Sequence, residues 1–133
     1  MTGERLGRLS LRFDAAYCIV VGLVVAASSS FASAAVALPM PLLVGIGGIT
    51  ALWGGYVCHA SATRPIRART RLVMIADLVA SAGLALTGAL AGTTVLTLAT
   101  LALAVDVAAF AVSQGVALRR LRIDGSPGAA SAG

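Results

Sequence analysis

An aspartate lies in the middle of one of the most apolar stretches of this chain. Residues 101–112 read LALAVDVAAFAV, and Asp106 is the one residue among them that is not apolar. A charge near the centre of a bilayer costs roughly 2.5–3.5 kcal/mol on insertion scales, so an acid kept in such a stretch indicates a function. The chemistry open to it is proton transfer or the binding of a cation.

Two further titratable residues, Asp77 and His59, lie inside apolar stretches. Counting about 1.5 Å per helical residue from the nearest arginine places Asp77 about 9 Å deep, His59 about 7 Å deep and Asp106 about 20 Å deep. We take Asp106, Asp77 and His59 as the candidate catalytic or proton-carrying residues. Because the chain has no lysine and its arginines flank the apolar stretches, we expect Asp106 to be protonated, or to face a narrow wet cavity inside the bundle.

Several polar residues share one predicted depth with His59 and Asp77, namely Asp14, Cys18 and Cys58. Cysteine and histidine suit soft metals, but no C-x-x-C or H-x-x-x-H spacing is present. We therefore predict no metal site and no cofactor, and we expect both cysteines to be free thiols on a reducing side of the membrane.

Some polar residues have a structural explanation that needs no chemistry. Asp14 follows arginines at the predicted start of a helix, where a carboxylate suits the helix dipole. Ser113 and Gln114 are predicted to form hydrogen bonds between helices. The small residues Gly47, Ala51 and Gly55, spaced four apart, are predicted to pack helices closely.

The composition decides which elements must position these residues. Of the 133 residues, 59% are hydrophobic and 11% are charged, against about 25% charged in soluble domains. The mean hydropathy is +0.96. So short a soluble domain could not bury that much apolar surface, so the composition indicates that lipid is the solvent.

Four apolar runs are long enough to cross a hydrocarbon core of about 30 Å as helices. They cover about 13–36, 42–62, 72–91 and 93–118. We predict an all-α membrane protein in which residues 1–122 form one domain, with the four helices in an up-down antiparallel bundle, and residues 123–133 form a disordered cytoplasmic tail. The breaks are LPMP, the basic RPIRARTR and AGTT, where Gly92 ends one helix and a threonine caps the next.

The arginines predict the orientation. All ten basic residues are arginine, and they precede the first run, join the second to the third, and follow the fourth. The other side, LPMP and AGTT, carries no charge, so the positive-inside rule predicts an inner-membrane protein with cytoplasmic N- and C-termini. The net charge of +5 follows from this topology, so we expect lipid and no nucleic acid as a partner.

The first run has an alternative interpretation. Its basic start, its apolar stretch and the sequence ASA at 32–34 also resemble a secretory signal with a cleavage site. Because the apolar stretch continues to Leu38 and reaches spanning length, we expect a retained helix.

In size and helix count the chain is similar to small multidrug-resistance exporters and to fluoride channels. The exporters resemble one another through a glutamate well inside helix one, whereas here the nearest acid is Asp14, at the edge of the run. Both groups often insert in two orientations with little arginine bias, so we transfer none of their residues. The arginine-only, alanine-rich composition resembles that of small four-helix integral membrane proteins of high-GC bacteria, which implies no particular activity.

Three function classes remain at this stage. The first is a small transport or accessory membrane protein with Asp106 and Asp77 as a proton- or cation-responsive pair. The second is an intramembrane enzyme in which Asp106, Asp77 and His59 act as acid and base on a lipophilic isoprenoid- or polyketide-like substrate. The third is a structural interaction subunit. The predicted partners are the lipid bilayer, a lipophilic small molecule or cation, and a parallel homo-oligomer.

Overall fold

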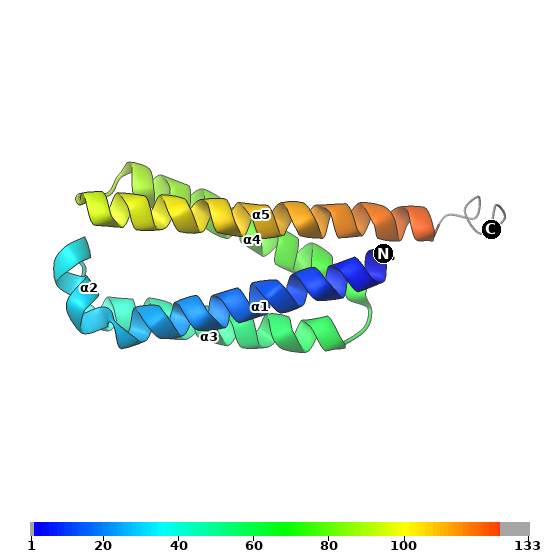
Figure 1. The fold of residues 1–133 in the computed structure, drawn as a ribbon, viewed down its shortest axis with the longest axis horizontal. Helices are drawn as coiled ribbons and strands as arrows, with labels where there is room; N and C mark the ends of the chain where they lie inside the picture. The colour runs from blue at the N-terminus through cyan, green and yellow to red at the C-terminus, as the bar shows by residue number, and fades with distance from the viewer. Residues whose placement is uncertain (1, 126–133) are drawn as a thin grey trace.

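The structure is a computed structural model, and it describes residues 2–125. Within that range the chain forms five helices and no strand (Figure 1). Four of them are long and apolar enough to span a membrane. The helices are α1 (Gly3–Ala27), α2 (Ser29–Val36), α3 (Met40–Ala62), α4 (Ile66–Ala89) and α5 (Thr94–Asp124).

Three of the long helices extend well beyond the apolar runs at their arginine-bearing ends. The first helix begins at Gly3 and not near residue 13, and Thr2 caps it by accepting a hydrogen bond from the N–H of Arg5. α4 begins at Ile66, directly after Pro65, and α5 continues to Asp124. Arginine is a good helix former, so the helix continues where the apolar pattern, which reports only contact with lipid, has ended.

The first apolar run forms two helices where we predicted one. The chain leaves helical geometry at Ser28, whose hydroxyl donates to the Val24 carbonyl oxygen at 2.6 Å. Serine side chains compete with the backbone for hydrogen bonds, and three of them stand here in succession. The short α2 then ends at Ala37, which has a left-handed backbone with φ 55°.

The prolines and threonines of the other breaks act at helix starts. Pro39 is the N-cap of α3 and Pro41 lies in its first turn, where the missing N–H costs nothing. Thr93 is the N-cap of α5 and accepts from the N–H of Leu96 at 3.2 Å, so the predicted threonine cap is confirmed.

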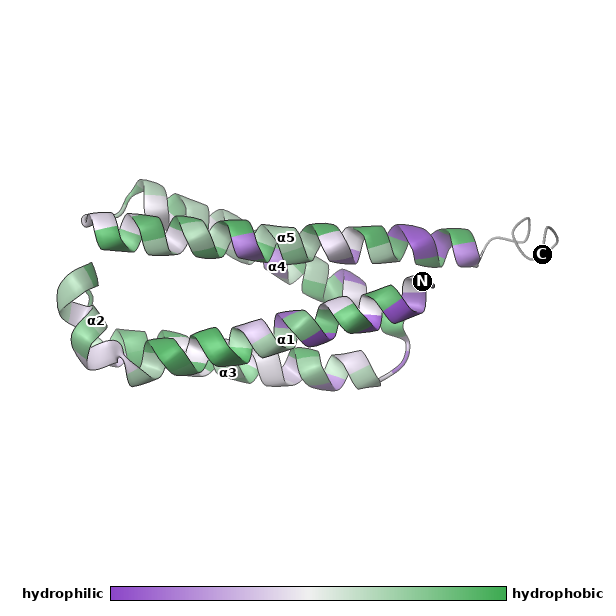
Figure 2. Cartoon of the chain, in the orientation of Figure 1, coloured by the Kyte–Doolittle hydropathy of each residue, from purple (hydrophilic) through white to green (hydrophobic). Residues whose placement is uncertain are grey.

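The long helices pack as two close pairs. α1 packs along α3, α4 packs along α5, and α1 also contacts α5 and so joins the pairs, whereas α3 and α4 touch little. Figure 1 shows the N-terminus, the α3–α4 connection and the end of α5 together at one end of the molecule, with α2 at the other. The arginine-bearing segments therefore share one end, where the hydrophilic colour gathers in Figure 2.

The α1–α3 pair is close because glycines meet at its crossing. A Cβ built on Gly22 would lie 2.5 Å from the Gly47 carbonyl oxygen and 2.6 Å from the Ala51 nitrogen. The predicted close packing is therefore confirmed at Gly47 and Ala51. The predicted packing is not found at Gly55, because a Cβ built there has no atom within 4 Å. Gly54 packs against α1 instead. Residues four apart rotate by about 40° per step, so a spacing of four leaves the contact face after two steps.

Large apolar side chains cover the outside of the bundle. Phe31, Leu52 and Leu90 are exposed by 83%, 77% and 77%. Such a surface suits contact with lipid chains and does not suit water. Most of the predicted tail, 126–133, lies outside the described residues.

The glycine crossing gives a matched pair of substitutions. We expect Gly22→Ala to lower the free energy of unfolding by about 1–3 kcal/mol, because the new methyl group meets backbone atoms that cannot move aside. Gly55→Ala meets open space and should stabilise the helix by up to about 1 kcal/mol. Thermal unfolding in detergent measures both, and equal effects would contradict the crossing at Gly22.

Candidate functional site

A single amide connects three helices in the interior. The side-chain Nε2 of Gln114 on α5 donates to Oδ2 of Asp77 on α4 at 2.9 Å and to Oδ2 of Asp14 on α1 at 3.4 Å. Gln114 and Asp14 are fully buried and Asp77 is 3% exposed. We call these three residues the carboxyl–amide cluster.

The inner faces of the helices bring the cluster together. On α1 Ser10, Asp14 and Cys18 are all buried, and two steps of four residues spread them over about 80° of the helix, so they line its inward side. On α5 Gln114 lies between the buried Ala111 and Ala117, whose small side chains let α1 and α4 approach. Asp77 lies one turn after the buried Val73 on the inner face of α4.

The carboxyl groups of Asp14 and Asp77 act on each other and have no basic partner. The other groups that act on them are the Gln114 amide and the thiol of Cys18, which donates to Oδ1 of Asp14 at 3.6 Å. No arginine or histidine of residues 2–125 forms a hydrogen bond or an ion pair with either carboxyl group. Two unpaired charges side by side in so dry a place would be costly, so the pair requires a proton or a bound cation.

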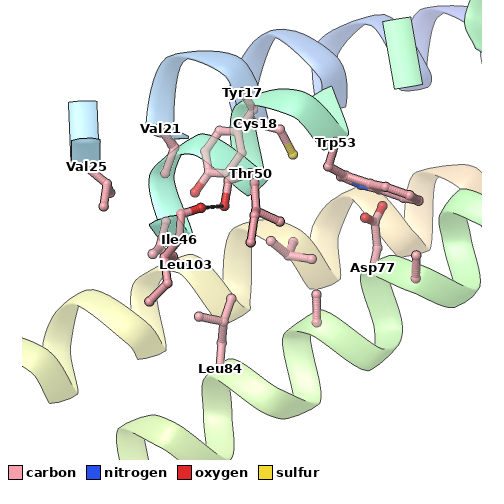
Figure 3. Close-up of a pocket in the computed structure, with 14 residues that line it drawn as sticks. Tyr17, Cys18, Val21, Val25, Ile46, Thr50, Trp53, Asp77, Leu84 and Leu103 are labelled. Atoms are coloured by element: carbon pink, nitrogen blue, oxygen red, sulfur yellow. Dashed lines mark hydrogen bonds between the residues drawn. The ribbon is translucent and has the colours of Figure 1, made fainter. Parts of the chain in front are cut away.

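A cavity of about 410 Å³ opens beside the cluster (Figure 3). Its lining comes from α1, α3, α4 and α5, and apolar side chains dominate it. Figure 3 shows the Asp77 carboxyl group and the Trp53 ring close together at one end, with Leu84 and Leu103 farther along. The lining residues are Tyr17, Cys18, Val21, Val25, Ile46, Ile49, Thr50, Trp53, Ala76, Asp77, Ala80, Leu84, Leu103 and Val107.

The Trp53 ring, which lines this cavity, packs against a second aromatic residue that is itself hydrogen-bonded. The Trp53 ring lies 5.2 Å from the Tyr56 ring, and the Tyr56 hydroxyl accepts from Nη1 of Arg69 at 2.9 Å. The hydroxyl of Thr50 donates to the Ile46 carbonyl oxygen, so it presents no free donor to the cavity. The polar function in the cavity therefore rests mainly on Asp77.

Asp106 lies elsewhere, and the prediction that it faces the inside of the bundle is wrong. Its side chain is exposed and accepts a hydrogen bond from the Tyr17 hydroxyl at 2.7 Å. The Tyr17 ring in turn packs against Phe110, with 5.3 Å between the ring centres. The Tyr17 phenol therefore gives Asp106 one hydrogen-bond donor at the bundle surface.

The predicted depth of Asp106 also needs correction, because it was counted from Arg119 on its own helix and not from the arginines of the helices beside it. The hydroxyls of Ser10 and Ser113 lie 2.6 Å apart, so Arg12 on α1 is level with α5 residues well before Arg119. Asp106 contacts Tyr17, which lies five residues, or about 7.5 Å, from Arg12 along α1. The value of about 20 Å counted from Arg119 is larger, because Arg12 lies farther along the bundle than Arg119 does.

The other predicted polar residues divide into an inner and an outer group. Asp14, Cys18 and Asp77 meet inside, as their shared depth suggested, whereas Cys58 and His59 are exposed on α3. Both cysteines are free thiols, as predicted. Among residues 2–125, neither these side chains nor any other three histidine, cysteine or acidic side chains are arranged so that they could hold a metal ion. The structure thus does not bring Asp106, Asp77 and His59 together.

Asp14 and Gln114 have larger roles in the structure than their places in the sequence indicate. Because the apolar run begins at Phe13, the sequence predicts that Asp14 lies at the start of a helix. It is in fact the twelfth residue of α1. The predicted hydrogen bond of Gln114 between helices is confirmed, but its two acidic partners were not foreseen. The available signal was that the only glutamine in the chain stands in the middle of an apolar helix.

No family model, curated protein or solved structure matches this chain. The function must therefore be argued from the site.

The cluster predicts a stability difference between two substitutions on α5. We expect Gln114→Leu to lower the free energy of unfolding by about 1–3 kcal/mol, because it leaves two buried carboxyl groups without their shared donor. Asp106→Leu should leave stability unchanged or raise it, because that side chain is exposed on an apolar surface. Thermal unfolding in detergent compares them, and a reversed order would contradict the structural role given to Gln114.

Proposed function

We propose that this chain is a multi-pass inner-membrane protein that binds a lipophilic cation in its central cavity and exchanges it for a proton, as a small transport protein does. The observation that carries this proposal is the pair of buried carboxyl groups, Asp14 and Asp77, which lie beside an apolar cavity and have no basic partner among residues 2–125. Four apolar helices are compatible with a multi-pass membrane protein.

The cavity wall favours an apolar ligand of small-molecule size. A volume of about 410 Å³ lies within the range of ligand sites, and such sites are mostly apolar with a few polar groups that fix orientation. Here the Trp53 ring and the Asp77 carboxylate share one end (Figure 3). An aromatic face beside a carboxylate suits an organic cation, because the ring quadrupole and the negative charge both attract it.

Charge balance links the ligand to a proton. When the cavity is empty, a proton on the Asp14–Asp77 pair lowers its charge, and the Gln114 amide can still donate to whichever oxygen remains charged. When an organic cation enters, its own charge takes over that role and the proton leaves. Because proton and ligand satisfy the same carboxyl groups, binding one weakens binding of the other.

The arrangement of the arginines supports the orientation. The arginine-bearing segments lie at one end of the molecule, and the two breaks at the other end carry no charge (Figure 2). The positive-inside rule then places both the N-terminus and the end of α5 in the cytoplasm. The up-down packing of the four spanning helices belongs to the same proposal.

The binding proposal can be tested with benzyltrimethylammonium, a small aromatic quaternary cation. Trp53 is the only tryptophan and lines the cavity, so its fluorescence reports occupancy in detergent. We expect saturable binding that weakens as the pH falls, because protons compete for the carboxyl groups. In a weakly buffered solution, binding should release about one proton per ligand.

Two asparagine variants serve as test and control. We expect Asp77→Asn to weaken binding at least tenfold and to abolish proton release, because the cavity loses its carboxylate. Asp106→Asn changes an acid outside the cavity lining and should bind as the unaltered protein does. Binding that is independent of pH, or equal in both variants, would refute the exchange.

The orientation can be tested with single cysteines in a Cys58→Ala background, which removes the exposed thiol and keeps the buried Cys18. In intact cells, a membrane-impermeant maleimide should label Gly92→Cys and should not label Arg64→Cys. Both positions are open, since Gly92 has no atom within 4 Å of a built Cβ and the Arg64 side chain is 83% exposed. Equal labelling would mean insertion in both orientations.

A further inference from the structure

We propose that the outer face of α4, at the arginine end, is a binding site for an anionic phospholipid. A shallow groove of about 510 Å³ runs along this face, and its lining combines two arginines with apolar side chains. The phosphate lies between Arg67 and Arg71, and an acyl chain follows the apolar side chains toward the middle of the helix. The lining residues are Pro65, Arg67, Ala68, Arg71, Leu72 and Ile75.

The two arginines form a charged pair with no acid between them. Arg67 and Arg71 are four residues apart on a helix, so their side chains are neighbours and repel each other. Arg8 binds Glu4 and Arg69 binds Tyr56, whereas neither groove arginine has a partner among residues 2–125. A phosphate group relieves the repulsion and accepts charge-assisted hydrogen bonds from both guanidinium groups.

The start of α4 adds to the attraction for an anion. Pro65 is its N-cap and offers no side-chain hydrogen bond, and the first turn contains no acidic residue. The free N–H groups of that turn and the positive end of the helix dipole therefore act together with Arg67. This contribution supports the site, while the groove and its two arginines define it.

The apolar part of the groove favours a lipid over free phosphate. Leu72 and Ile75 are exposed by 48% and 47%, and Val79, one turn farther along the same face, is exposed by 69%. This row begins beside the arginines and leads into the part of α4 that is apolar enough to span a membrane. A phospholipid has the same order of charge and hydrocarbon, whereas a soluble phosphate would leave the apolar row uncovered.

This site is independent of the proposed cation exchange, because the groove and the cavity share no residue. The two can therefore fail separately in experiment.

Native mass spectrometry of the full chain in detergent tests the proposal. We expect bound phosphatidylglycerol to survive at concentrations where phosphatidylcholine with the same acyl chains does not. In Arg67→Gln/Arg71→Gln, binding of phosphatidylglycerol should fall about tenfold or more. The matched control Arg119→Gln/Arg122→Gln removes the same charge from exposed positions on α5 and should retain binding.

Three results would overturn the site. Equal loss in both double variants would mean that the arginine end attracts lipid as a whole. Equal binding of the two lipids would show that the charge of the headgroup does not contribute to binding. If glycerol phosphate competed as strongly as the lipid does, the apolar row would not contribute to binding. Thermal unfolding checks that each variant folds, and the single variants Arg67→Gln and Arg71→Gln carry the test if the double variant does not.

Discussion

The cost of placing two carboxyl groups in a dry interior governs this structure. Asp14 and Asp77 come from different helix pairs, and the amide of Gln114 reaches both. An amide can donate but cannot neutralise, so the cluster satisfies part of the hydrogen-bonding demand and leaves the charge to be balanced by a proton or a ligand. The contact that joins α1, α4 and α5 is therefore also the place where negative charge must be balanced.

The rest of the fold follows from where the helices approach and where they do not. Glycines bring α1 and α3 into backbone contact at Gly22 and Gly47, and a hydrogen bond from Ser81 to the Ala104 carbonyl oxygen ties α4 to α5. α1 joins the two pairs through contacts with α5 that include the hydrogen bond between Ser10 and Ser113. Because α3 and α4 touch little, space remains between the pairs, and the Asp77 carboxyl group borders it.

The structure separates two kinds of intramembrane acid that look alike in a sequence. Asp106 is surrounded by apolar neighbours in the chain, yet it lies at the bundle surface, where the Tyr17 hydroxyl satisfies it. Asp77 has an equally apolar setting and is buried beside a second acid. Two carboxyl groups meet only in the second case, and the cavity borders one of them, so a role in cation exchange fits Asp77 better than Asp106.

The sequence by itself determined that the chain is helical, that four of its helices can span a membrane, and that its arginines gather in three segments, before the first apolar run, between the second and third, and after the fourth. Those properties follow from composition and local pattern, which act over a few residues. The sequence also placed Asp77 and Cys18 at one depth. It gave Asp14 a position at the edge of a helix, because an apolar run does not show where a helix begins. Only the tertiary structure decided that Gln114 meets two acids and that Asp106 faces outward. Both depend on the rotation and the axial shift of one helix against another, which are set by contacts such as Gly22 on Gly47 and not by the composition of either helix.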